Sequence, residues 1–158
     1  MIDRRGFGRL AVAGLAASAL QYGPAAAQAT KTVLFVCQYG SVKSSIAREV
    51  FRARAAALGV GVSAISRGIT PQDHISPALL EHLRADGIDP KRDPLRKLDQ
   101  DVLSAADIVV LFDTLPADLV RKDALDWSAM PSMNQSYDQA RAFLDPRIDA
   151  LLTTLRGH

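Results

Sequence analysis

The sequence contains a single cysteine, Cys37, only three histidines and few aromatic residues among its 158 residues. A lone cysteine cannot form a disulfide within the chain, so the fold must be stabilised by its hydrophobic core. The histidines and the cysteine are not spaced as metal ligands, which argues against a zinc site. We therefore expect neither a metal nor a cofactor.

Net charge is also low, because 19 Lys and Arg residues face 17 Asp and Glu residues and leave a formal charge of +2. No basic run interleaved with aromatic residues occurs, so we expect no binding to nucleic acid. After residue 30, no segment is long and apolar enough to cross a bilayer, so we expect no membrane contact for that part of the chain. Nothing in the pattern indicates an oligomeric state.

The first 29 residues have the layout of an export signal. Arg4 and Arg5 are followed by Phe7, then by a weakly hydrophobic stretch over residues 10–20 and a small-residue cleavage site at residues 27–29. The arginine pair indicates the twin-arginine route. An anchor helix is the alternative, but the apolar stretch is too short and too rich in alanine and glycine to span a bilayer. We predict an exported, periplasmic protein.

After a signal peptide over residues 1–29, residues 30–158 suffice for one domain and are too few for two. Strand and helix patterns alternate in this part of the chain. They predict strands at residues 32–37, 60–66 and 107–112, helices at 44–58, 77–86, 99–105 and 136–156, a helix or turn at 116–122, and an irregular segment at 126–135. This alternation predicts an α/β fold, a three-layer, doubly wound parallel sheet of about four strands with helices on both faces.

Two reactive side chains, Cys37 and Asp113, end the first and third predicted strands. In parallel sheets, ligands bind at the carboxyl ends of the strands, near the point where the strand order reverses. The turn-prone loop 38–43 follows Cys37 and leads into a helix, so backbone N–H groups can hold a phosphate-like anion and favour an ionised cysteine. The alternatives are a buried structural cysteine and, for Asp113, a helix N-cap.

Several motifs together resemble the low-molecular-weight protein tyrosine phosphatases and the related thioredoxin-coupled arsenate reductases. The resemblance starts with the apolar run that ends at Cys37, with the Lys43-Ser44 pair six residues later and with the Ile46-Ala47 that opens a helix. It continues across the rest of the chain, through Ser66-Arg67-Gly68, His74-Ile75-Ser76-Pro77, Gly87-Ile88-Asp89 and Ala106-Asp107-Ile108-Val109-Val110.

The resemblance implies a role for each residue of the cysteine loop. Cys37 would attack phosphorus and form a phosphocysteine, Lys43 would occupy the position of an arginine that clamps the phosphate, and Ser44 would stabilise the thiolate. The phosphoester or other oxyanion would be bound by the loop, which consists of Gln38, Tyr39, Gly40, Ser41, Val42 and Lys43. Oriented N–H groups stabilise the charge of a phosphoryl group in transfer.

Three departures from the family pattern weaken this expectation. Lys43 carries a compact charge without the planar two-point fork of arginine. Gly40 stands where the family usually has an asparagine, which predicts a less rigid loop. The segment 127–134, where an Asp-Pro general acid is expected, contains no carboxylate.

Other acidic and basic residues are candidates for the missing proton donor. Asp113 and Asp126 are better placed than Asp145, which precedes Pro146 inside the closing helix and is expected to mark a kink. His74 lies in a loop that could face the site, although a solvated loop histidine is the simpler interpretation.

The sequence thus leaves three functional hypotheses. The first is a cysteine-dependent phosphomonoesterase with weakened activity. The second is a protein that binds or senses oxyanions such as phosphate or arsenate without turning them over. The third is an arsenate reductase, which would need an external thiol because the chain has no further cysteine to relay electrons.

Overall fold

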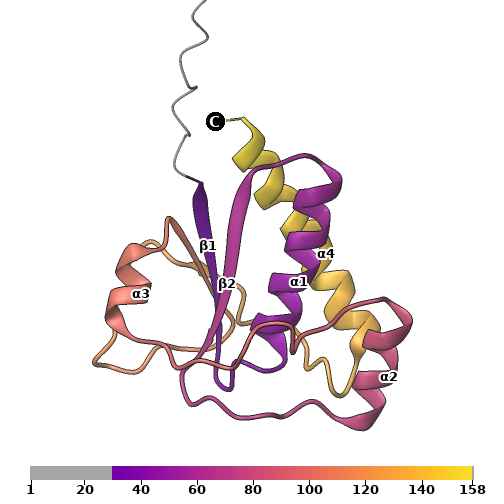
Figure 1. Ribbon diagram of the computed structural model, residues 1–158. Helices are drawn as coiled ribbons and strands as arrows, with labels where there is room; N and C mark the ends of the chain where they lie inside the picture. The colour runs from indigo at the N-terminus through magenta and orange to yellow at the C-terminus, as the bar shows by residue number, and fades with distance from the viewer. Residues whose placement is uncertain (1–29, 158) are drawn as a thin grey trace, which may run out of the picture.

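The computed structural model describes residues 30–157, so the predicted signal peptide lies outside the described residues. Figure 1 shows an α/β fold in which strands and helices alternate along most of the chain. Its strands are β1 (Lys31–Cys37), β2 (Val62–Gly68), β3 (Ile108–Leu111) and β4 (Leu125–Asp126). Its helices are α1 (Lys43–Ala57), α2 (Pro77–Ala85), α3 (Gln100–Ala105) and α4 (Tyr137–Arg156).

The four strands form one parallel sheet in the order β2-β1-β3-β4, which confirms the predicted fold class. β1 lies in the middle, where Phe35 pairs with Ser66 of β2 on one side and with Val110 of β3 on the other. The chain builds outward from β1 to β2 and later returns to the opposite side of β1. The strand order therefore reverses between β1 and β3, and ligand sites of such sheets form at this point.

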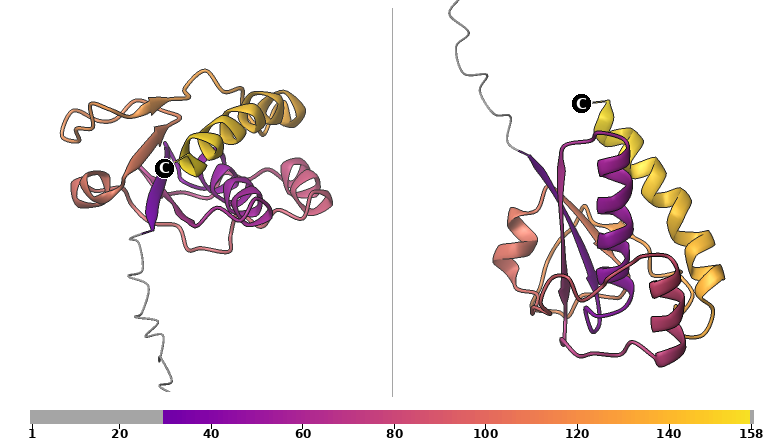
Figure 2. Two further views of the ribbon diagram at one scale, coloured as in Figure 1. Left: turned by 90° about the horizontal axis from the view of Figure 1, so that it is seen from above. Right: turned by 45° about the vertical axis from the view of Figure 1, so that its right-hand side comes forward.

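Helices cover both faces of the sheet, as Figure 2 shows, because β1 is apolar on both faces. Val33 and Phe35 point to the core on the side of α1 and α4, whereas Leu34 and Val36 point to a second, smaller core on the side of α3. Trp127 closes the larger core, with its ring centroid 6.3 Å from that of Phe35. Cys37 continues the first alternation and is also buried.

The second strand begins and ends two residues later than the sequence predicts. Its start is delayed because the backbone of Val60 is still bonded to the last turn of α1, where the Val60 N–H donates to the Ala55 carbonyl. Its end extends to Gly68, because both backbone groups of Gly68 are hydrogen-bonded to the passing segment at Arg96 and Leu98. Both differences arise from backbone partners that the apolar pattern does not reveal.

For residues 116–122 the sequence predicts a helix or a turn, and the structure has a turn, in which the Val120 backbone is hydrogen-bonded to the side chain of Gln100 through both its N–H and its carbonyl. The segment expected to be irregular over 126–135 begins within the two-residue edge strand β4. α4 includes Pro146 within its length. Within the described residues, no helix has both the length and the apolar character that a bilayer crossing requires.

Candidate functional site

The thiol of Cys37 lies at the carboxyl end of the central strand β1 and is surrounded by hydrogen-bonding groups. The Gly40 N–H donates to its Sγ over 3.1 Å, and the Ser44 hydroxyl lies 3.1 Å from the same atom. The cysteine as a whole is only 3% exposed. Donors aimed at a sulfur stabilise its ionised form, which is the nucleophilic one.

The cysteine loop is shaped by two glycines that approach each other closely. Gly40 has a φ of +73°, in the left-handed region that side chains disfavour. A Cβ on Gly40 would lie 2.7 Å from the backbone nitrogen of Gly68, and a Cβ on Gly68 would lie 2.7 Å from the carbonyl carbon of Tyr39. The loop can therefore cross the end of β2 only with glycine at both positions.

Backbone hydrogen bonds also brace this loop against the segment that follows β2. The carbonyls of Cys37, Gln38 and Tyr39 accept from the N–H groups of residues 69, 70 and 72, at 3.1, 2.8 and 3.1 Å. The sequence predicts a less rigid loop because of Gly40, yet these contacts hold three successive peptide units in place.

Helix α1 begins directly after the loop, and its first turn leaves donors free for a ligand. Val42 precedes the helix and provides no side-chain cap, and the first turn contains no acidic residue. The unpaired N–H groups of a helix start, together with the helix dipole, attract anions. Lys43 adds a positive charge at the same place, is half-buried, and forms no ion pair with any residue in the described range.

Asp113 lies two residues after β3, and its carboxylate accepts the Gln38 N–H over 2.8 Å. This hydrogen bond joins the two strand ends across the point where the strand order reverses. No helix begins directly after Asp113 in the described part of the chain, where the next helix is α4 at Tyr137, so the alternative of a helix N-cap is wrong. Asp113 fixes the first residue of the cysteine loop instead.

A pocket of about 280 Å³ opens above the thiol. Six of the predicted site residues line it together with four that come from two other segments: Cys37, Gln38, Tyr39, Val42, Lys43 and Asp113, and then His74, Ser132, Met133 and Asn134. Three further predicted residues, Gly40, Ser41 and Ser44, are buried outside the lining. Among these, Ser41 accepts the N–H of His74 with its hydroxyl oxygen, so it supports a wall of the pocket from behind.

Asn134 joins two walls of the pocket, a role that sequence reasoning missed. Its side-chain amide donates to the His74 carbonyl over 2.8 Å, and its amide oxygen accepts the Ser76 N–H over 3.0 Å. No pattern within residues 127–134 signals this clamp, because its partners lie far away in the sequence. Neither Ser132, Met133 nor Asn134 is an acid, so this wall provides no carboxyl group where the family pattern has one.

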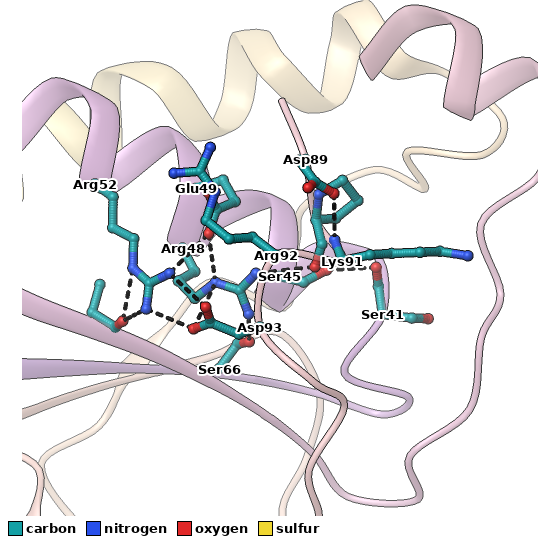
Figure 3. A network of polar contacts seen from close by, with 12 residues as sticks. Ser41, Ser45, Arg48, Glu49, Arg52, Ser66, Asp89, Lys91, Arg92 and Asp93 are labelled. Atoms are coloured by element: carbon teal, nitrogen blue, oxygen red, sulfur yellow. Dashed lines mark hydrogen bonds and ion pairs between the residues drawn. The ribbon is translucent and has the colours of Figure 1, made fainter. Parts of the chain in front are cut away.

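A network of buried charges lies on the side of α1 that faces β2 (Figure 3). Arg48, which is 1% exposed, donates to Glu49 over 2.9 Å, to the Ser66 hydroxyl over 2.6 Å and to the Pro90 carbonyl over 3.0 Å. Arg52 donates to both carboxylate oxygens of Asp93, at 3.1 and 2.7 Å. These contacts fix α1, and with it the helix start at the thiol, against β2 and the 89–94 segment.

A larger cavity, about 590 Å³, lies away from the thiol and is lined by α1, by residues of the segment 86–92 and by Arg141 of α4. Four arginines line it, but each one is paired with a carboxylate: Arg52 with Asp93, Arg54 with Asp145, Arg92 with Glu49, and Arg141 with Asp86. The candidate site is therefore the smaller pocket at Cys37. Among residues 30–157, no cluster of three His, Cys, Asp or Glu side chains could hold a metal ion.

A buried thiol lies at the end of a central parallel strand, and the loop after it leads into an uncapped helix; this arrangement defines a cysteine-loop protein whose helix start can attract an anion. The comparison with protein families shows to which family the chain belongs. The chain belongs to the low molecular weight phosphotyrosine protein phosphatase family, whose model matches residues 32–148. No curated protein matches the chain.

Solved structures share the same fold. A low molecular weight protein tyrosine phosphatase from T. tengcongensis is 24% identical, with a TM-score of 0.57 and coverage of 79% of this chain and 99% of that one. A thioredoxin-dependent arsenate reductase from Corynebacterium glutamicum is 25% identical, with a TM-score of 0.58 and coverage of 82% and 64%. Wzb from Vibrio vulnificus, solved in complex with benzylphosphonate, is 14% identical, with a TM-score of 0.61 and coverage of 80% and 99%.

Proposed function

We propose that this protein hydrolyses phosphoesters through a phosphocysteine formed on Cys37, at a rate that Lys43 limits. The observation that carries the proposal is the environment of the thiol, which faces a pocket and has the Gly40 N–H and the Ser44 hydroxyl at 3.1 Å from its sulfur. A cysteine nucleophile divides one difficult displacement into two easier ones. Membership of the phosphatase family supports the same reaction.

The remaining residues of the site have supporting roles in this reaction. The free N–H groups of the first turn of α1 and the charge of Lys43 bind the phosphoryl oxygens. Asp113 is a positioning residue that holds Gln38 and thereby the start of the loop. Tyr39 forms the rim of the pocket, where it is 38% exposed.

Lys43 is the reason for a lowered rate. Its ammonium group attracts a phosphoryl group as a point charge, whereas a guanidinium holds two oxygens in one plane. Loss of one preorganised donor typically costs roughly 10²–10³ in rate. We therefore expect a slow enzyme with ordinary affinity for the phosphate group.

The test compares wild-type residues 30–158 with Cys37→Ser on p-nitrophenyl phosphate. The proposal requires that hydrolysis depend on Cys37 and that acid quenching trap a phosphorylated protein in the wild type. Equal rates for the two proteins would reject it.

The replacement of the family's arginine by Lys43 and the absence of an Asp-Pro acid also favour a second function, the binding of oxyanions. A site with a cation, free helix N–H groups and no acid at Ser132–Asn134 can bind oxyanions without turning them over. Calorimetry with phosphate, sulfate and arsenate on wild type and Lys43→Ala tests this binding function. Tight binding that Lys43→Ala abolishes, in a protein without Cys37-dependent hydrolysis, would establish it in place of the first.

We further propose that residues 1–29 direct export by the twin-arginine route. Support for this comes from the sequence alone, in the arginine pair at Arg4 and Arg5 and the small-residue cleavage site at residues 27–29. Replacement of both arginines by lysine should retain the protein, uncleaved, in the cytoplasmic fraction. Unchanged processing of that variant would argue against the route.

A further inference from the structure

The pocket above Cys37 is lined by one imidazole side chain, and the roles above leave it unused. This side chain is His74, in the loop between β2 and α2. Building on the proposed function, we propose that His74 protonates the leaving oxygen of the phosphoester. The same imidazole then accepts a proton from the water that releases the phosphocysteine.

The backbone of His74 is fixed relative to the thiol from two directions. Its N–H donates to the Ser41 hydroxyl of the cysteine loop over 3.0 Å, and its carbonyl accepts from the Asn134 amide over 2.8 Å. A general acid must be held at one distance from the leaving group, because proton transfer requires contact within a hydrogen bond.

The ring of His74 is also held. It stacks on Tyr39 with a centroid distance of 3.8 Å and an interplanar angle of 19°. Its Nε2 lies 2.7 Å from the side-chain oxygen of Gln72. Because this oxygen can only accept, Nε2 keeps its hydrogen, and Nδ1 is the nitrogen whose proton is free to exchange. Within residues 30–157, Nδ1 has no hydrogen-bond partner.

Several charged or titratable groups face this ring. Its own loop contributes Asp73, which is paired with Lys91 over 2.6 Å; the hydrogen bond from Lys91 holds the pKa of Asp73 below its usual range. The cysteine loop contributes Cys37, Tyr39 and Lys43, and the end of β3 contributes Asp113. The wall at residues 132–134 contributes no titratable side chain.

Asp113 is less suited to this role than His74. Its carboxylate accepts the Gln38 N–H over 2.8 Å, and protonation would weaken the contact that positions the loop. His74 can change its charge without breaking any hydrogen bond that shapes the cysteine loop, because those bonds use only its backbone.

The reaction balances with the groups at hand. The Cys37 thiolate forms the S–P bond while the P–O bond to the leaving group breaks, and the departing oxygen takes the proton of the His74 imidazolium. A water oxygen then bonds to phosphorus, its proton goes to the neutral imidazole, and the S–P electron pair returns to sulfur. Phosphate leaves, and both residues regain their starting states.

The decisive variant is His74→Phe, which keeps a flat ring for Tyr39 but has no exchangeable proton. His82→Phe is the matched control, because His82 stacks on Tyr137 in the same manner, with centroids 5.0 Å apart, outside the pocket. Each variant is assayed on phenyl phosphate and on p-nitrophenyl phosphate, whose leaving group needs little protonation. The pH dependence of kcat/KM is recorded for both.

We expect His74→Phe to lower kcat/KM on phenyl phosphate by roughly 10²–10⁴-fold and much less on p-nitrophenyl phosphate. The fall of kcat/KM at alkaline pH should disappear, and His82→Phe should match the wild type. If His74→Phe does not fold, His74→Ala replaces it, with partial rescue by added imidazole as the expected result.

Three results would overturn the inference. Equal losses on both substrates with the alkaline fall intact would show that His74 only supports the pocket. Hydrolysis that depends on Cys37 and is indifferent to His74 would reject the role of His74 alone. Hydrolysis that survives Cys37→Ser would instead reject the proposed function and this inference with it.

Discussion

Two polar regions flank the first turns of α1, and they are organised in opposite ways. In the buried network, each charged side chain has partners; Arg48 alone contacts Glu49, Ser66 and the Pro90 carbonyl. In the pocket at Cys37, the two hydrogen-bond partners of the sulfur are neutral groups, and Lys43 forms no ion pair with the described residues. The charges of the buried network are therefore paired without a ligand, whereas the charge of Lys43 in the pocket is not.

This difference distinguishes charges that stabilise the fold from charges that are available to bind a ligand. A buried arginine with all its partners has nothing left to offer a ligand, and it stabilises mainly by leaving no charge unpaired. An unpaired lysine beside free helix N–H groups gains most when an anion arrives. The contrast predicts that changes in the network affect stability, whereas changes in the pocket affect rate.

The largest expected effect follows from Arg48→Met. This substitution removes a buried cation and takes the donor away from the Ser66 hydroxyl and the Pro90 carbonyl, while Glu49 keeps only its contacts with Arg52 and Arg92. We expect the free energy of unfolding to fall by about 3–5 kcal/mol, measured by urea denaturation. Arg84→Met is the control, because its pair with Glu81 is exposed and should contribute less than about 1 kcal/mol. Similar losses for the two variants would remove the distinction between the regions.

The next effect concerns the rate. Lys43→Arg supplies the planar fork that the pocket lacks, so we expect kcat/KM on p-nitrophenyl phosphate to rise by roughly 10²–10³-fold. The free energy of unfolding should change little, since Lys43 has no ion pair to lose within the described residues. Lys97→Arg, at an exposed position outside the pocket, should leave the rate unchanged. A rate that is no higher with arginine would mean that the loop geometry excludes the fork.

The third prediction, of a smaller effect, concerns the free energy of unfolding of Gly40→Ala, with Gly59→Ala as its control. Both glycines have positive φ, +73° and +65°, so both variants incur about 1–2 kcal/mol of backbone strain. Only the Cβ at position 40 meets another backbone, that of Gly68, whereas no atom lies within 4 Å of the one at position 59. Gly40→Ala should therefore unfold more easily, by about 1–3 kcal/mol beyond the control, and should slow alkylation of Cys37. Equal stabilities would contradict the close crossing.

The smallest effect is a dependence of stability on pH. The hydrogen bond from Arg52 holds the pKa of Asp93 below its usual range, and the charge of Arg48 acts in the same direction. A carboxyl whose folded pKa is lowered stabilises fully above its unfolded value of about 3.9 and loses that contribution as pH falls through the folded value. The pair is a third exposed, so the loss should be about 1 kcal/mol or less.

The comparison variants for this last effect are Asp93→Asn and Asp118→Asn. Urea midpoints measured from pH 5 down to pH 2 should converge for wild type and Asp93→Asn as the pH falls. Asp118 is exposed and forms no ion pair with the residues described, so its variant should follow the wild type throughout. A constant gap between wild type and Asp93→Asn across this range would contradict the linkage.

Much of the fold is predictable because it depends on local patterns. The apolar run before Cys37 indicates a strand buried on both faces, and this alone implies a central position with helices on either side. The approach of Asp113 to the cysteine loop follows from the rule that ligand sites form where the strand order reverses. The shift of β2 could not be predicted, because it results from backbone hydrogen bonds that the apolar pattern does not reveal. At residues 116–122 the pattern leaves a helix or a turn open, and the turn is fixed by the side chain of Gln100.

The site is predictable to a lesser extent. The cysteine loop is contiguous, so its residues are found from sequence, but the opposite walls of the pocket come from distant segments. Asn134 carries no signal, because its amide binds backbone groups of His74 and Ser76. In the sequence, Arg48 is one of several charged residues in an amphipathic helix. Its burial cannot be predicted, because it depends on a small residue, Ser66, in the facing strand.

The crossing of Gly40 and Gly68 also constrains how this sequence can vary. In a library of all single substitutions, these two positions should tolerate almost nothing, whereas Gly59 and Gly87, with open space around them, should accept asparagine. A Cβ at position 40 would clash with the backbone of Gly68, and a Cβ at position 68 would clash with the backbone of Tyr39 and Gly40, so a change of a neighbouring side chain cannot relieve either clash. Lineages that keep the thiol should therefore inherit the two glycines as a pair, and drift at one of them should mark chains in which the loop has lost its shape.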